Sequence, residues 1–159
     1  MTEYKSEVKT INASQEAVYE RLSDLNNLAV IQQHIDNPEA RKRIEQEAAG
    51  KMTPQQMESI IERLRTLQFD RDSVSGNTPI GDVALRIIER EGPKTVKFAV
   101  EGAPIDANMW IQLLPAGDNQ CAMRLTMKAD LNFFIHQMLG NKLQQGIDGL
   151  ATLLANIPY

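Results

Sequence analysis

The chain has 159 residues, of which 42% are hydrophobic and 24% are charged, as is typical of a soluble globular domain with a sizeable core. Its 17 basic and 21 acidic residues give a formal net charge of −4, which argues against nucleic acid as a partner because phosphate binding needs a basic face. With a single cysteine, no signal peptide and no membrane-length apolar run, we expect one cytoplasmic domain over residues 1–159 that does not insert into membranes.

The N-terminal residues predict a strand followed by a capped helix. Side chains alternate over Tyr4–Ile11, which indicates a half-buried strand. One face of that strand would carry Tyr4, Ser6, Val8 and Thr10. Ser14 suits an N-cap because its hydroxyl can accept a hydrogen bond from an amide of the first helical turn. The apolar face of the helix that follows consists of Ala17, Val18, Leu22 and Leu25.

The polar segment from Pro38 to Leu67 predicts two further helices. The first, over Glu39–Ala49, has a thin apolar stripe and is expected at the surface. The second follows Thr53, the expected N-cap, with Pro54 at the first helical position and Gln56, three residues after Thr53, completing a capping box. Its apolar face predicts packing against the rest of the fold and consists of Met57, Ile60, Ile61, Leu64 and Leu67.

From Phe69 onwards the apolar period changes from helical spacing to two, which predicts five strands joined by short turns. The predicted strands are Phe69–Ser75, Gly81–Arg90, Thr95–Glu101, Asn108–Leu114 and Cys121–Ala129. The fourth is apolar on both faces, so Trp110 is assigned to the core. Short turns connect antiparallel neighbours, so we expect a meander with the N-terminal strand at one edge.

A long amphipathic helix is predicted over Ala129–Tyr159. Its apolar stripe consists of Ile135, Met138, Leu139, Leu143, Ile147, Leu150, Leu154 and Ile157. Gly140, Gly146 and Gly149 each cost roughly 1 kcal/mol relative to alanine, which indicates close packing on the sheet or space left for a ligand. The predicted fold is therefore α+β: a curved antiparallel sheet wrapped around a long C-terminal helix, with additional helices between the first and second strands.

Few residues in the chain are suited to catalysis or metal binding. His34, His136 and Cys121 share no metal-ligand spacing, and no glycine-rich phosphate loop follows a strand, so we expect neither metal nor cofactor. His136, near the start of the last helix, is the one weak candidate for a general base. The alternative is that His136 is a helix residue without a role, because no orienting partner is visible.

Three stretches carry a resemblance to a known superfamily. Ile11–Asp24 reads INASQEAVYERLSD, which resembles the opening of the START-like or SRPBCC superfamily, whose members have the helix-grip fold. That superfamily includes lipid-transfer domains, polyketide cyclases and the birch-pollen-allergen group. Met109–Leu113 and the helix end at Ala155–Tyr159 also resemble a small bacterial branch described as polyketide cyclase-like. The resemblance covers nearly the whole chain and implies a hydrophobic cavity between sheet and helix.

The strand alternation names the residues that would line such a cavity. They are Val96, Phe98, Val100, Met109, Ile111, Leu113, Met123, Leu125 and Met127 on the strands, facing Met138, Leu139, Leu143 and Ile147 on the helix. Because these positions are apolar, the favoured function is binding or transport of a small hydrophobic molecule, a lipid or a polycyclic, polyketide-like compound. The alternatives are a cyclase or dehydratase using the same cavity, and a protein-interaction module acting through the insert at 38–67.

Overall fold

The computed structural model describes residues 2–29, 32, 37–48, 53–78, 81–102, 106–130 and 133–155. Its elements, in chain order, are β1 (Thr2–Lys5), β2 (Lys9–Ile11), α1 (Gln15–Leu22), the 3-10 helix η1 (Leu25–Ala29), α3 (Pro38–Ala48), α4 (Pro54–Arg65), β3 (Gln68–Phe69), β4 (Ser73–Thr78), β5 (Gly81–Glu91), β6 (Thr95–Glu101), β7 (Asp106–Pro115), β8 (Cys121–Asp130) and α5 (Phe133–Ala155). The long helix thus begins after a strand that includes Ala129, four residues later than the sequence predicts.

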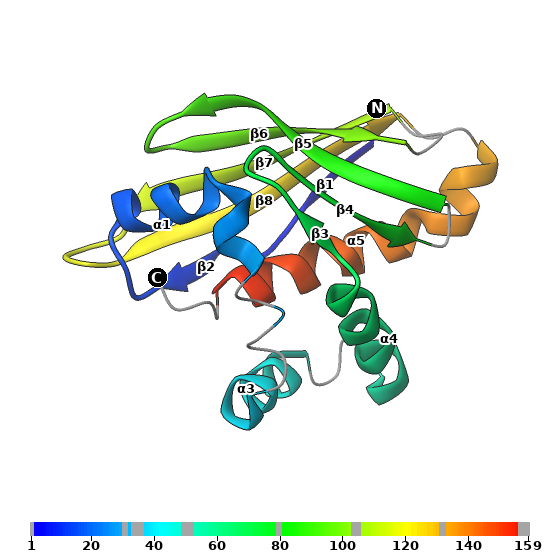
Figure 1. The fold of residues 1–159 in the computed structure, drawn as a ribbon, viewed down its shortest axis with the longest axis horizontal. Coiled ribbons are helices and arrows are strands. Elements are labelled where there is room, and N and C mark those ends of the chain that lie inside the picture. Colours follow the sequence, from blue (N-terminus) through cyan, green and yellow to red (C-terminus); the bar gives the residue numbers. More distant parts are fainter. Residues whose placement is uncertain are drawn as a thin grey trace.

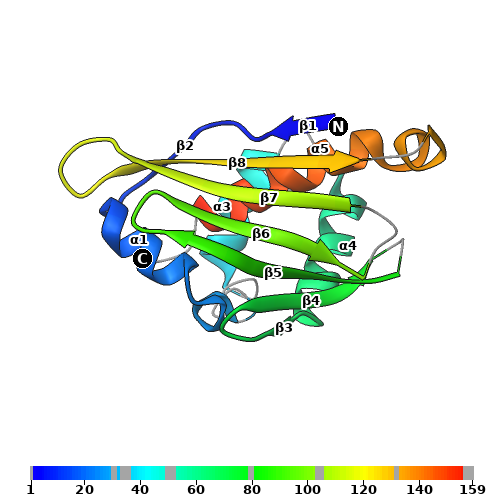
Figure 2. The same cartoon turned by 90° about the horizontal axis from the view of Figure 1, so that it is seen from above.

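The strands form one antiparallel sheet of eight, in the order β1-β8-β7-β6-β5-β4-β3, with β2 also paired to β8 (Figure 2). All the helices lie on one side of this sheet (Figure 1). Helix α5 runs along β8, β1 and β2, while α1 packs on β6, β7 and β8. We call the face toward these helices the concave face and the opposite one the convex face. This arrangement is the predicted helix-grip α+β fold.

The predicted N-terminal strand is divided into β1 and β2 by residues 6–8. The hydroxyl of Ser6 accepts a hydrogen bond from the Leu125 amide at 2.9 Å, in place of a backbone carbonyl. The pairing then resumes one residue later, with Lys5 opposite Thr126 but Lys9 opposite Met123. An extra residue reverses the alternation. Tyr4 and Ser6 are therefore buried, whereas Val8 and Thr10 are exposed, so the prediction that all four share a face is wrong.

The first meander strand is also divided, because Asp70 to Ser73 form a turn. The Asp70 amide donates to the Ser73 carbonyl at 2.8 Å, and the Asp70 carboxylate accepts from the Arg71 amide at 2.6 Å. Two short strands, β3 and β4, replace the predicted single strand over Phe69–Ser75. Gly76, just beyond the predicted end of that strand at Ser75, lies within β4 opposite Val83.

Local capping explains where two helices begin. The Ser14 hydroxyl accepts from the Ala17 amide at 3.2 Å, as predicted, and starts α1. The capping box of α4 is also confirmed: the Thr53 hydroxyl accepts from the Gln56 amide at 3.2 Å, and the Gln56 side chain accepts from the Thr53 amide at 3.0 Å. Each bond satisfies an amide that the helix itself leaves without a partner.

The helices of the insert, α3 and α4, lie beyond α5 on the side away from the sheet (Figure 1). An ion pair between Arg41 and Glu58 connects them. Helix α4 contacts β4, and its Met57 and Ile61 are 7% and 4% exposed. An exposed apolar patch on α4 would favour a protein-interaction function for the insert, but the described part of this face is packed.

Helix α5 is attached to the sheet edge through the Gln144 side chain, which donates to the Lys5 carbonyl at 2.8 Å. Ile147, Ala151 and Leu154 form its buried stripe. Gly146 is exposed, and a Cβ added there would meet no atom within 4 Å, so this glycine neither packs on the sheet nor makes room beneath the helix. Among the described residues, no helix combines the length and apolar character that crossing a membrane requires.

The assignment of Trp110 to the core is wrong. Met109, Ile111 and Leu113 of β7 are buried on the concave face, so Trp110 and Gln112 between them point to the convex face, where both are half-buried. Leu114, on the same face, is 65% exposed. An aromatic side chain on an exposed face is not distinguishable from a core residue by hydrophobicity alone.

Candidate functional site: the concave face of the sheet

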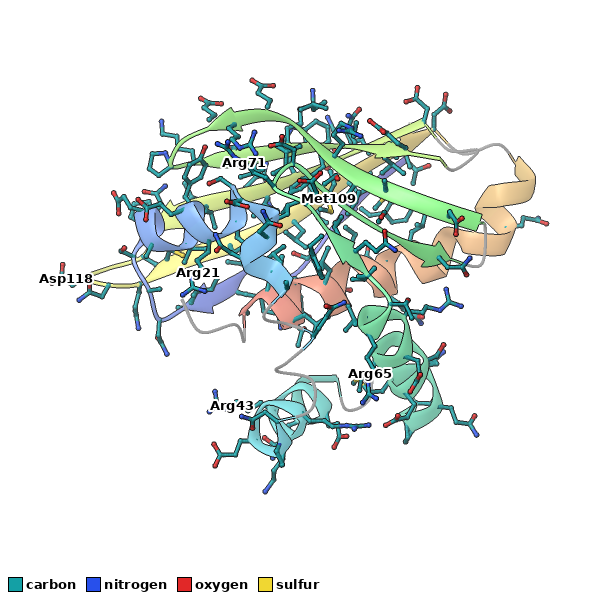
Figure 3. The ribbon with its side chains drawn as sticks, in the orientation of Figure 1. Arg21, Arg43, Arg65, Arg71, Met109 and Asp118 are labelled. Carbon is teal, nitrogen blue, oxygen red and sulfur yellow. The ribbon has the colours of Figure 1, made fainter. Side chains whose placement is uncertain are left out.

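The centre of the concave face is closely packed. Eight of the residues predicted to line a cavity are at most 2% exposed: Val96, Phe98, Met109, Ile111, Leu113, Met123, Leu125 and Ile147. Strict alternation along β6, β7 and β8 explains why they converge, because every second side chain of each strand points to the same face. Figure 3 shows Met109 in the middle of the molecule, whereas Arg43, Arg65 and Asp118 lie at its periphery.

The remaining predicted positions differ in how far the structure describes them. Val100, Met127 and Leu143 are half-buried. Met138, Leu139 and His136 fall within α5, but their side chains lie outside the described part of the structure. The catalytic assignment considered for His136 therefore stays a prediction.

Packing is uneven across the concave face. At one end α1 covers the sheet, and the side chains beneath it are almost fully excluded from solvent. Toward the start of β5 and the end of β6, apolar side chains become half-buried, namely Val83, Leu85 and Val100 on the strands and Leu143 and Leu150 on α5. Strands β5 and β6 are separated by β7 from β8, β1 and β2, along which α5 is packed. Apolar surface on the concave face is therefore reachable from solvent at this end.

Tyr4 is the polar residue that the prediction of the site missed. It lies on the edge strand β1, opposite Met127, and is 7% exposed within the apolar cluster. Its hydroxyl oxygen is buried and has no hydrogen-bond partner. Most buried polar groups are paired, and leaving one unpaired costs about 1–3 kcal/mol. An unpartnered hydroxyl within an apolar region marks a place where a bound molecule could supply a partner.

The reason Tyr4 was missed is the break between β1 and β2. Alternation placed Tyr4 on one face with Val8 and Thr10, which the structure shows to be exposed, so nothing in the pattern separated Tyr4 from them. The Ser6 side chain, which causes the break through its bond to Leu125, carries no sequence signal that distinguishes it from any strand serine. The one usable signal was Tyr4 itself, an aromatic residue in an otherwise polar segment.

Acid–base groups are scarce on the described concave face. Among described residues less than 9% exposed, Tyr4 and Cys121 are the ionisable ones. Burial raises the pKa of the Cys121 thiol above its ordinary value of 9.0, which keeps it protonated at neutral pH. Within the same described part of the chain, no group of three or more His, Cys, Asp or Glu side chains is arranged to hold a metal ion.

No family model matches the chain, and no curated protein matches its sequence. Solved structures do share its fold. A conserved protein from Geobacillus kaustophilus is 17% identical with a TM-score of 0.53, and the match covers 96% of this chain and 93% of that one. The protein XoxI from Bacillus cereus is 15% identical with a TM-score of 0.57, covering 97% and 94%.

A third similar structure is truncated norcoclaurine synthase from Thalictrum flavum, 10% identical with a TM-score of 0.60, covering 98% of this chain and 89% of that one. Another structure of that synthase is a complex with dopamine and hydroxybenzaldehyde. At these identities the likeness concerns the fold and does not extend to substrates or residues. The chain therefore has a START-like helix-grip fold, which it shares along nearly its whole length with bacterial proteins and with an enzyme.

Proposed function

We propose that this protein binds a small, largely apolar molecule between the concave face of the sheet and α5, and that it acts as a carrier or sensor of that molecule rather than as an enzyme. The observation that carries the proposal is the buried, unpartnered hydroxyl of Tyr4 within an apolar cluster. A ligand with one hydrogen-bonding group would give the Tyr4 hydroxyl a partner, while the rest of the ligand surface is buried against apolar side chains.

The uneven packing of the concave face supports the same proposal. Half-buried Leu85, Val100 and Leu143 provide apolar contact area and a route from solvent. Burial of apolar area contributes about 25 cal/mol for each Å² removed from water, so a ligand gains affinity there without ion pairs. A lipid chain or a polycyclic compound has the required shape and polarity.

Binding is favoured over catalysis by the chemistry of the described concave face. General acid–base catalysis needs an ionisable group within hydrogen-bond distance of the substrate. The buried candidates are the protonated Cys121 thiol, which is a weak hydrogen-bond donor, and the Tyr4 hydroxyl, which is an ordinary hydrogen-bonding group. Norcoclaurine synthase shows that an enzyme can have this fold, but its reaction does not transfer to a chain 10% identical to it.

The test is the binding of N-phenyl-1-naphthylamine, an uncharged apolar fluorophore whose emission rises on burial. We expect saturable binding to the wild-type protein and at least a roughly tenfold loss of affinity in Val100→Phe, because the added ring occupies the accessible part of the concave face. Val8→Phe is the matched control: the same substitution at a residue 62% exposed should leave affinity unchanged.

Two results would overturn the proposal. One is the absence of saturable binding by the wild-type protein. The other is equal affinity in Val100→Phe and Val8→Phe, which would place the fluorophore elsewhere. Overpacking can cost about 1–3 kcal/mol, so the thermal unfolding of Val100→Phe is measured first, and Leu85→Phe replaces it if it does not fold.

A further inference from the structure

Trp110, the single tryptophan of the chain, stands on the convex face between two lysines. Its neighbours across the sheet are Lys97 of β6 and Thr126 of β8. The Lys97 ammonium lies 5.3 Å from the centroid of the indole ring, and that of Lys128 lies 5.7 Å from it. Both distances are within the range of cation–π attraction, which holds positive charge close to the ring.

Beside Trp110, toward β8 and β1, the convex face has an open hollow of about 360 Å³, which we call the basic hollow. It is lined by Glu3, Lys5, Trp110, Gln112, Arg124, Thr126 and Lys128. Three cationic side chains face one carboxylate there, on a protein whose formal net charge is −4. The local charge is therefore opposite in sign to that of the whole chain.

One cationic group of the basic hollow, the Arg124 guanidinium, is held by a neighbouring side chain. The Gln112 side-chain oxygen accepts from Arg124 Nε at 3.3 Å and from the Thr126 hydroxyl at 3.0 Å. Thr126 is only 5% exposed, so this pair of bonds fixes Gln112 and, through it, the guanidinium. Because Arg124 uses Nε for this bond, its terminal nitrogens are not engaged by Gln112.

Glu3 partly neutralises the hollow. Its carboxylate lies 3.0 Å from the ammonium of Lys5 and 3.8 Å from that of Lys128. The hydrogen bond from Lys5, with the charges of Lys5, Lys128 and Arg124, holds the pKa of Glu3 below its ordinary value of 4.5. Glu3 is therefore ionised at neutral pH, and one carboxylate leaves an excess of positive charge among three cations.

A second hollow, of about 250 Å³, lies on the other side of Trp110 and has the opposite character. It is lined by Glu89, Glu91, Thr95, Lys97, Trp110 and Gln112. The bulge between Ile87 and Glu89 places Glu89 opposite Lys97, on the convex face. With two carboxylates and one ammonium, this side repels anions, so an anion is directed to the basic hollow.

We propose that the basic hollow binds a small organic carboxylate with a flat apolar part, the carboxylate on Arg124 and Lys128 and the flat part against Trp110. A planar guanidinium matches the two oxygens of a carboxylate, and an indole ring offers apolar surface to a flat molecule. The basic hollow is on the face of the sheet opposite α5, so it is separate from the apolar site proposed above, and the two proposals are tested independently.

The test uses the fluorescence of Trp110, which as the single tryptophan reports on this face alone. The ligand-free protein is titrated with benzoate and, separately, with benzylamine at constant ionic strength, because salt screens charges at a surface. Benzylamine carries the same ring with a positive charge. We expect a saturable change with benzoate and none with benzylamine.

Three variants assign the effect to residues. Arg124→Gln should weaken benzoate binding roughly tenfold or more, since it removes a charge-assisted contact. Glu3→Gln should strengthen it, because the competing carboxylate is lost. Arg86→Gln is the matched control: Arg86 lies on the same face, 51% exposed and paired with Glu101 at 2.8 Å, but outside the hollow, so affinity should not change.

The proposal is overturned if benzoate gives no saturable response, if benzylamine gives an equal one, or if Arg124→Gln binds benzoate as the wild type does. Lys128→Gln gives the same test should Arg124→Gln fail to fold. A loss of binding in Arg86→Gln comparable to that in Arg124→Gln would also contradict it, because the effect would then reflect the charge of the whole face rather than the hollow.

Discussion

Replacing Tyr4 by phenylalanine tests the interpretation of the concave face most simply. The substitution removes one buried oxygen and keeps the ring that packs in the apolar cluster. In most proteins a buried tyrosine hydroxyl is bonded, and its removal destabilises. Here the hydroxyl has no partner, so we expect the ligand-free Tyr4→Phe protein to be more stable than the wild type.

The size of the effect follows from the cost of an unpaired buried group. That cost is about 1–3 kcal/mol, and for a chain of this length each kcal/mol shifts the melting temperature by about 2–4 °C. If a ligand bonds to the hydroxyl, its affinity should fall in the variant by the value of one hydrogen bond, about 0.5–1.5 kcal/mol, or roughly two- to tenfold.

The assay is urea and thermal unfolding of both proteins after the bound small molecules have been extracted, with Tyr19→Phe, at a half-buried tyrosine of α1, as control. Binding of 1-naphthol, which carries a hydroxyl, should weaken in Tyr4→Phe, while binding of naphthalene should not. A loss of more than about 1 kcal/mol of stability in ligand-free Tyr4→Phe would contradict this expectation, because it would show that the hydroxyl has a structural partner.

Three further predictions concern the framework. Gly146→Ala should stabilise the protein by about 0.5–1 kcal/mol because the position is helical and open. Gly102→Ala should destabilise it by at least about 1 kcal/mol, since φ at Gly102 is +86° and the new Cβ would lie 2.7 Å from the Asp82 carbonyl oxygen. Urea unfolding measures both effects. The hydrogen bond from Arg90 lowers the pKa of Asp72 below 3.8, so ionised Asp72 stabilises the folded protein above that pH and loses this effect as the pH falls below it. The stability difference between wild type and Asp72→Asn should therefore shrink as the pH falls through this range. Cys121, buried with a raised pKa, should react with a thiol reagent only on unfolding; fast reaction of the native protein would show that β8 is accessible at that point.

Most of the architecture could be predicted because it depends on periodicity and capping. The alternation of β6 and β8 identified every inward-facing residue of those strands, and Ser14 and Thr53 marked the starts of α1 and α4. The breaks in the strands could not be predicted in this way. They coincide with local hydrogen bonds that periodicity does not register: the Leu125 amide donates to the Ser6 hydroxyl, and two bonds close the turn at Asp70.

The site was predicted less completely than the fold, for two physical reasons. Alternation says which face a residue occupies, but not whether that face is filled, so closely packed Phe98 and half-buried Val100 had the same appearance in the sequence. Hydrophobicity assigned Trp110 to the core, although Lys97 and Lys128 beside it on the convex face make a half-exposed ring favourable. Whether a side chain is closely packed or half-exposed depends on which residues of other strands lie beside it, and those residues are far away in the sequence.

Native mass spectrometry of the protein purified from its own cells shows directly whether the concave face holds a small apolar molecule. We expect an added mass from a small molecule that leaves on mild activation, and we expect the fraction carrying that mass to be smaller in Val100→Phe than in Val8→Phe. Spectra that show the unmodified chain alone, from cells in every growth phase, would contradict this expectation.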